Sequence, residues 1–118
     1  MSRKIGDIGE DLACEILREN GYKVISRNYF ARCGEIDVVS SVGGEIVFVE
    51  VKYRKDEGFG TAIEAVTKQK LKRIYKSALF YLNENGLEDS DWRIDVIGIN
   101  PLTSDYEIIK NVYIENNC

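Results

Sequence analysis

Two acidic residues and a lysine lie on the strands of one predicted β-hairpin. Strand-like runs at residues 35–41 and 45–54 flank the pair Gly43-Gly44, and a Gly-Gly pair between two β-branched runs is a strong hairpin signal. With Gly43-Gly44 as a two-residue loop, Asp37 comes opposite Glu50 and Glu35 opposite Lys52. Opposed residues of an antiparallel pair share a face, with Cβ atoms about 5 Å apart. The sequence therefore predicts two carboxylates side by side, with a lysine one step along the same face.

Such an arrangement of charges needs compensation. Like charges directly opposite each other destabilise a sheet, and these acids interrupt runs rich in Ile, Val and Phe. A divalent cation is the simplest compensation, since Mg²⁺ binds one or two carboxylates together with waters and phosphate oxygens. The alternative is a solvated face on which Lys52 and Arg54 neutralise the acids. Ile46 and Phe48, which share that face, favour the cation.

Two predicted helices carry further charged candidates. Glu10 lies at the edge of the apolar stripe of a helix over residues 5–20. It could add a metal ligand there, or it could simply be a first-turn glutamate that the helix dipole stabilises. A second helix, capped by Thr67 and running to about Asn83, has a basic face. This face could contact phosphates or be an ordinary solvated surface. Its basic residues are Lys68, Lys70, Lys72, Arg73 and Lys76.

The order of predicted elements defines the fold class. The first helix (5–20) is followed by three strands, at 22–29, 35–41 and 45–54. The second helix (67–83) is followed by two strands, at 93–99 and 106–114. This order predicts an α/β fold that borders on α+β, a three-layer sandwich with a central mixed sheet flanked by helices. The crossover through the second helix predicts a parallel strand pair. The length of 118 residues suits a single domain over 1–118.

Composition limits the chemistry. The chain has no histidine, which excludes histidine acid/base catalysis and histidine-ligated zinc, and its three cysteines form no Cys-x-x-Cys motif. Catalysis would therefore depend on carboxylates, lysines, hydroxyls or a hard metal ion. The net charge is −4, but it combines +2 over residues 1–83 with −6 over 84–118. No apolar run approaches the roughly 20 residues of a membrane span and no secretory signal is seen, so we expect a cytoplasmic protein.

Several motifs resemble a known family. Asp37 followed by Glu50-Val51-Lys52 resembles the metal-binding motif of the PD-(D/E)XK nuclease superfamily, which has the restriction-endonuclease-like fold. Together with Gly9-Glu10 and Gly34-Glu35, these residues make the chain similar, over about residues 5–100, to the small bacterial YraN-type family. That family is grouped with the archaeal Holliday-junction resolvases and the tRNA-endonuclease-like fold. One departure is Ile36, where many members of the superfamily have a proline.

The resemblance implies roles for individual residues. Asp37, Glu50 and the backbone carbonyl of Val51 would bind Mg²⁺ or Mn²⁺, and Glu10 would complete the site. Lys52 would orient or deprotonate the attacking water and offset charge in the transition state. Lys70 would face the site from the second helix. The expected nucleic-acid contacts are Arg54, Lys68, Lys70, Lys72, Arg73 and Lys76.

The function implied is a metal-dependent endonuclease acting on DNA, in particular on branched or otherwise structured substrates. Since junction-cutting relatives act as dimers, a homodimer is expected by analogy. Two alternatives remain open at this point. One is a nuclease-like fold that binds nucleic acid or a protein without cutting, which the net acidity favours. The other is a structural or assembly protein whose charged hairpin is merely solvated.

Overall fold

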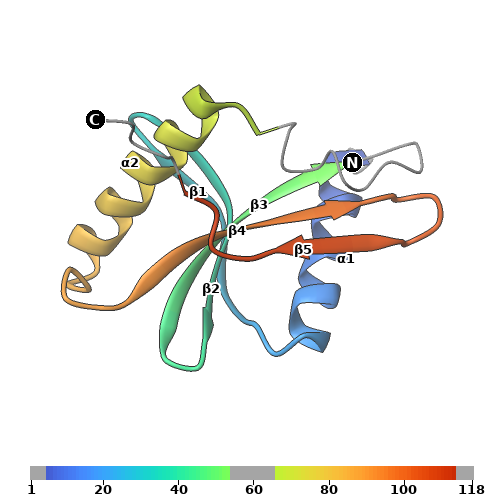
Figure 1. The fold of residues 1–118 in the computed structure, drawn as a ribbon, viewed down its shortest axis with the longest axis horizontal. Coiled ribbons are helices and arrows are strands. Elements are labelled where there is room, and N and C mark those ends of the chain that lie inside the picture. Colours follow the sequence, from blue (N-terminus) through green and yellow to red (C-terminus); the bar gives the residue numbers. More distant parts are fainter. Residues whose placement is uncertain (1–4, 54–65, 114–118) are drawn as a thin grey trace.

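The seven predicted elements are all present in the computed structural model, which describes residues 5–53 and 66–113, with side chains from Gly9 onward. The elements in chain order are α1 (Ile5–Glu19), β1 (Lys23–Ala31), β2 (Gly34–Val42), β3 (Glu45–Tyr53), α2 (Lys68–Glu84), β4 (Trp92–Ile99) and β5 (Tyr106–Ile109) (Figure 1). Thr67 caps α2 as predicted, since its hydroxyl accepts a hydrogen bond from the backbone amide of Lys70 at 3.1 Å. The last strand ends earlier than expected, because Asn111 adopts a left-handed backbone with φ of 57°.

The strands form one mixed sheet in the order β1-β2-β3-β4-β5. Three neighbouring pairs are antiparallel, whereas β3 and β4 are parallel and in register from Ile46–Trp92 to Tyr53–Ile99. The chain between the two parallel strands includes α2, as the predicted crossover requires. The parallel pair expected from the sequence is therefore confirmed.

The two helices cover opposite faces of the sheet (Figure 1), so the predicted α/β sandwich with helices on both sides of a mixed sheet is confirmed. Apolar residues of α1 pack against one face of the central strands and form the α1-side core. Those of α2 pack against the other face and form the α2-side core. Within residues 5–53 and 66–113, no helix has the length and apolar character of a membrane span. The α1-side core includes Ala13, Leu17, Val38, Val49 and Ile97; the α2-side core includes Ile36, Val39, Phe48, Ile74 and Ala78.

The β2–β3 turn has the predicted two-residue loop. Gly43 and Gly44 both have positive φ angles, of 55° and 86°, and Val42 lies opposite Glu45. Positive φ at both central positions matches the twist of the flanking strands and favours glycine. The hairpin register predicted from the sequence is thus confirmed next to the turn, from Val42–Glu45 to Val38–Val49.

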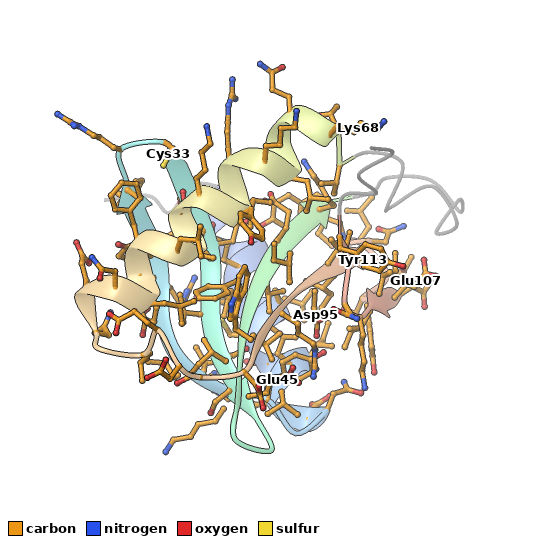
Figure 2. All side chains as sticks on the ribbon, turned by 60° about the vertical axis from the view of Figure 1, so that its left-hand side comes forward. Cys33, Glu45, Lys68, Asp95, Glu107 and Tyr113 are labelled. Carbon is orange, nitrogen blue, oxygen red and sulfur yellow. The ribbon has the colours of Figure 1, made fainter. Side chains whose placement is uncertain are left out.

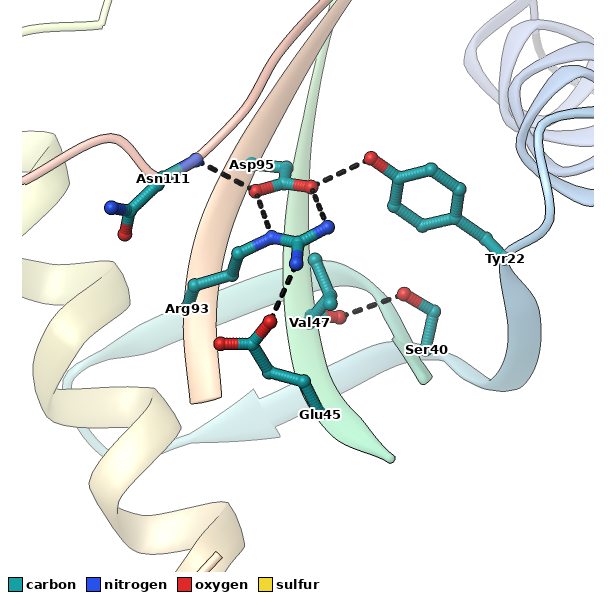
Figure 3. Close-up of polar contacts among 7 residues, drawn as sticks. All are labelled: Tyr22, Ser40, Glu45, Val47, Arg93, Asp95 and Asn111. Carbon is teal, nitrogen blue, oxygen red and sulfur yellow. Dashed lines mark hydrogen bonds and ion pairs between the residues drawn. The ribbon is translucent and has the colours of Figure 1, made fainter. Parts of the chain in front are cut away.

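A fully buried carboxylate ties three parts of the chain together (Figure 3). Asp95 on β4 accepts hydrogen bonds from Arg93 Nε at 2.9 Å, from the Tyr22 hydroxyl at 2.6 Å and from the Asn111 amide at 2.9 Å. Arg93 also donates to Glu45 at 2.6 Å. Burial and the hydrogen bond to Asp95 raise the pKa of Tyr22 to about 12. A buried charge with this many partners fixes the start of β1 and the segment after β5 onto β4.

Tyr22→Phe is expected to lower the free energy of unfolding by about 1.5–2 kcal/mol, because it removes a hydrogen bond to a buried carboxylate. Urea denaturation measures the change. Tyr106→Phe is the matched control, since that hydroxyl takes part in an exposed hydrogen bond with Asn20 at 3.2 Å. Equal losses in the two variants would contradict a structural role for the Asp95 network.

Candidate metal centre

The two central strands separate at the position of Asp37. Antiparallel pairing of β2 with β3 ends at Val38–Val49, one step before the predicted pair Asp37–Glu50. Beyond that point the amide of Val51 donates to the Asp37 carboxylate at 2.8 Å. The expectation that the ladder continues through Asp37–Glu50 and Glu35–Lys52 is therefore wrong. Asp37 instead lies in a fork between the strands.

The alternation of side chains along β2 also breaks at this residue. Ile36 packs in the α2-side core and Val38 in the α1-side core, although residues two apart on a regular strand share a face. On the neighbouring strand, Asn28 has a left-handed backbone with φ of 54°. Asp37 thus lies where the strand changes face, so that groups from both helical layers can approach it.

Three carboxylates converge in the fork. Glu10 from α1 and Glu35 and Asp37 from β2 each place a carboxylate oxygen within 4.8 Å of the others. Partial burial raises the pKa of Glu35, and the negative charges of Asp37 and Glu10 raise it further. Glu35 was not among the ligands predicted from the sequence. Its one signal in the sequence was its place two residues before Asp37, where an unbroken strand would put both side chains on the same face.

Glu50 is a fourth carboxylate at the fork and is the most buried of the four. It is 4% exposed, and burial together with the neighbouring charge of Asp37 raises its pKa to about 8. Glu50 lies two residues after Phe48 of the α2-side core, so both side chains are on the α2 face of the sheet. Among the described residues Glu50 Oε2 has no hydrogen-bond partner, and Lys70 Nζ is 3.9 Å away.

The predicted basic residues divide into two groups. Lys70 reaches the acids from α2, and Lys52 on β3 is near enough to lower the pKa of Glu50. Four others, Lys68, Lys72, Arg73 and Lys76, lie exposed on α2. Arg54 is outside the described residues. The structure therefore places Glu10 beside Asp37, and Asp37, Lys52 and Lys70 near Glu50. The four other described residues of the predicted basic set lie on the surface of α2.

The residues of the fork lie in a segment that this chain shares with a family of proteins. The profile of the Uncharacterised protein family UPF0102 matches residues 9–99, a segment that contains the four acids and both lysines. The chain belongs to this family. A UPF0102 protein of Symbiobacterium thermophilum is 45% identical over 101 residues, 86% of each chain. Another, from Vibrio campbellii, is 37% identical over 96% of this chain and 94% of the relative.

A weaker match is to a solved structure, the EndoMS–dsDNA2 complex. The match has a TM-score of 0.43 and 24% sequence identity. It covers 80% of this UPF0102 chain and 36% of that chain.

In this UPF0102 protein, Arg27 on β1 contacts two acidic residues in the middle of α1. Its guanidinium donates to Asp11 at 2.6 Å and lies 3.5 Å from Glu10 Oε2. The hydrogen bond to Asp11 raises the pKa of Arg27, which therefore stays charged. Arg27 was not predicted from the sequence, because the contact joins a strand and a helix whose relative position no local pattern reveals. It is a positioning residue for Glu10.

Gly9 allows the end of β3 to lie directly against α1. A Cβ at this position would overlap the half-exposed ring of Tyr53, which would have to rotate away. Tyr53 follows Lys52 on β3, and Glu10 follows Gly9 on α1. The absence of a side chain at Gly9 thus allows the Tyr53 ring to pack on α1 beside Glu10.

The donor set of the UPF0102 site suits a hard divalent cation. All four acids offer oxygen ligands, and Mg²⁺ and Mn²⁺ prefer oxygen over nitrogen or sulfur. Two carboxylate oxygens, Glu10 Oε2 and Glu50 Oε2, are buried and lack hydrogen-bond partners among the described residues. Arg27 forms an ion pair with Glu10 Oε2 at 3.5 Å and Lys70 one with Glu50 Oε2 at 3.9 Å, but neither contact is a hydrogen bond. Buried carboxylate oxygens without hydrogen bonds are costly, and a bound cation would reduce that cost. We therefore regard the fork as the candidate metal centre.

Proposed function

We propose that this UPF0102 protein is a divalent-metal-dependent endonuclease that hydrolyses phosphodiester bonds in DNA, with branched or otherwise structured DNA as its substrates. One observation carries the proposal. The half-buried Asp37 and the buried Glu50 share a fork in the sheet with Glu10 and Glu35, and one oxygen of Glu50 has no hydrogen-bond partner among the described residues. A solvated charged hairpin gives no reason to bury Glu50 beside Asp37.

The residues that would hold Mg²⁺ or Mn²⁺ are Asp37, Glu50, Glu10 and the backbone carbonyl of Val51, with Glu35 close enough to contribute. Such a cation supplies Lewis-acid polarisation of a phosphate and makes water more acidic. Lys52 would orient the attacking water, or take its proton, and would offset negative charge in the transition state. Lys70, already 3.9 Å from Glu50, would contact a phosphate at the same place.

The surface of α2 supports a nucleic-acid substrate. Lys68, Lys72, Arg73 and Lys76 are exposed on the helix that also carries Lys70. Phosphate contacts supply most of the sequence-independent affinity for nucleic acid, so a basic helix leading to the acids would guide a strand toward them. The negative net charge of the chain arises from residues 84–118, which carry −6, whereas residues 1–83, which include all of α2 except its last residue, carry +2.

A substrate panel tests the proposal. Linear duplex, single-stranded, flapped and four-way DNA are incubated with the purified protein in Mg²⁺, in Mn²⁺ and in EDTA. We expect cleavage of at least one structured substrate with either metal and none in EDTA. Binding without cleavage of any substrate would overturn the proposal in favour of a non-catalytic binding module. Sedimentation of the same samples tests the homodimer.

A further inference from the structure

A hollow of about 380 Å³ lies beside the candidate metal centre, between the tip of the β1–β2 hairpin and α2. Figure 2 shows Cys33 at this tip, next to the helix that begins at Lys68. Glu35 and Lys70 line the hollow and also belong to the candidate metal centre. The two sites are therefore continuous. A chain held in one would extend into the other.

The wall of the hollow is mainly cationic. Arg32, Arg73 and Lys70 line it, against the single carboxylate of Glu35 at the end nearest the metal centre. Within the described part of the chain, no carboxylate forms an ion pair with Arg32 or Arg73. Arginine guanidinium groups bind phosphate through paired hydrogen bonds. The charge of this wall is thus complementary to a phosphate group.

An exposed aromatic ring completes the hollow. Phe30, at the end of β1, lines it and is 73% exposed, which is more than any other described aromatic side chain. Bases of single-stranded nucleic acid stack on such rings largely irrespective of sequence, because every base has a π-face. The volume is at the low end of the roughly 300–1,000 Å³ of small-ligand sites. It suits one nucleotide better than a duplex.

We propose that this hollow binds one unpaired nucleotide of the substrate strand, next to the phosphate that is cut. Arg32, Arg73 and Lys70 contact its phosphate, and its base stacks on Phe30. The position beside the cut rests on the proposed function, and it makes unpaired DNA next to the metal centre the preferred substrate. The hollow would thereby read the structure of the DNA and not its sequence.

Binding of a short oligothymidylate that contains 2-aminopurine tests the stacking contact in EDTA, where no cleavage occurs. We expect the wild type to quench 2-aminopurine fluorescence on binding. Phe30→Leu should lose most of the quenching and weaken binding about tenfold, the effect of one stacked base. Phe80→Leu is the matched control, since Phe80 is 46% exposed on α2 and does not line the hollow. Equal effects in both variants would overturn the proposal.

Charge variants test the phosphate contact in the same assay. Arg73→Gln should weaken binding and reduce the dependence of affinity on salt by about one counterion. Arg18→Gln, an exposed arginine in the last turn of α1, should change neither. If Arg73→Gln behaves like Arg18→Gln, the hollow does not bind a phosphate and the proposal fails.

Alkylation of Cys33 locates the bound oligonucleotide. Cys33 is half-buried in the wall of the hollow and Cys14 is 1% exposed in the core, so Cys118→Ser leaves Cys33 as the reactive thiol. We expect the oligonucleotide to slow alkylation several-fold, whereas unchanged alkylation would overturn the proposal. A change of sedimentation in Phe30→Leu with unchanged binding would assign Phe30 to self-association instead. Binding with these signatures but no cleavage of any substrate would refute only the nuclease.

Discussion

Asp37→Asn is expected to lower Mg²⁺- or Mn²⁺-dependent DNA cleavage by about 10³-fold or more. Lewis-acid stabilisation of the transition state contributes several kcal/mol, and each 1.4 kcal/mol changes the rate about tenfold. Asparagine has nearly the same shape as aspartate. Its side-chain oxygen can still accept the hydrogen bond that the Val51 amide donates to Asp37 at 2.8 Å. The fold should therefore persist while the charge needed for the cation is lost. Single-turnover cleavage of the best substrate measures the effect.

A matched control and a metal titration separate this effect from misfolding. Glu45→Gln removes a carboxylate of β3 that lies outside the fork and forms an ion pair with Arg93 at 2.6 Å. The cleavage rate of this variant should therefore equal that of the wild type. A bound cation raises the stability of the wild type by about 2.7 kcal/mol at 100 times its Kd. Asp37→Asn should lose most of this gain. Equal shifts of the melting temperature would exclude the fork as the metal site.

Much of the fold follows from local patterns in the sequence. The Gly43-Gly44 pair determines the hairpin register, because both positions need positive φ and any other loop length would shift the pairing. Thr67 marks the start of α2, and the apolar period of the helix predicts the burial of Leu71, Ile74, Ala78 and Leu82. The same period also predicts burial of Tyr75 and Leu79, and this part is wrong, since they are 47% and 44% exposed. The early end of β5 was not predicted, since the apolar run of residues 106–114 gives no sign of the left-handed Asn111.

The candidate site was predictable only in part. Hairpin arithmetic placed Asp37 near Glu50, but it assumed regular pairing and therefore missed the fork. The change of face at Asp37 depends on Asn28 in the neighbouring strand and on packing in both cores. Glu35 joins the cluster because of that change. Of these features, only the place of Glu35 two residues before Asp37 had a local sequence signal.

Long-range contacts account for the other omissions. Arg27 reaches Asp11 and Glu10 across the interface of β1 with α1, and no periodicity links these positions. The approach of Lys70 to Glu50 was expected only from the family resemblance. Asp95 lies in an apolar run that predicts a strand, and its complete burial depends on Tyr22 and Arg93. Contacts between buried charged residues that are distant in sequence are thus the feature of this protein that sequence patterns predict least well.

Glu50→Gln is expected to stabilise the metal-free protein at pH 8 by a few kcal/mol while changing its stability little at pH 5. In the folded state the pKa of Glu50 is raised from 4.5 to about 8, because the carboxyl is buried beside Asp37. The folded chain therefore binds this proton more tightly than the unfolded chain does. The stability that this proton contributes is fully present below pH 4.5. It is lost as the pH rises from 4.5 through the folded-state pKa of about 8, by about 1.4 kcal/mol per pH unit over that range.

Urea denaturation of the wild type, Glu50→Gln and Glu45→Gln at pH 5, 6.5 and 8 in EDTA measures this difference. The unfolding free energy of the wild type and of Glu45→Gln should fall relative to that of Glu50→Gln as the pH rises. Three parallel curves would mean that Glu50 titrates normally and is not held in a costly state. The Glu45→Gln curve shows whether any carboxylate of β3 has the same effect.

The same proton links metal affinity to pH. A cation that binds Glu50 must displace the proton, so the affinity for Mn²⁺ should rise by up to about tenfold per unit between pH 6 and 8. Calorimetry in two buffers with different ionisation enthalpies would detect the released proton. Saturating Mn²⁺ should also abolish the loss of wild-type stability at pH 8, because the bound cation favours the charged carboxylate. A Mn²⁺ affinity that is independent of pH over this range would exclude Glu50 as a ligand, even if Asp37 binds the metal.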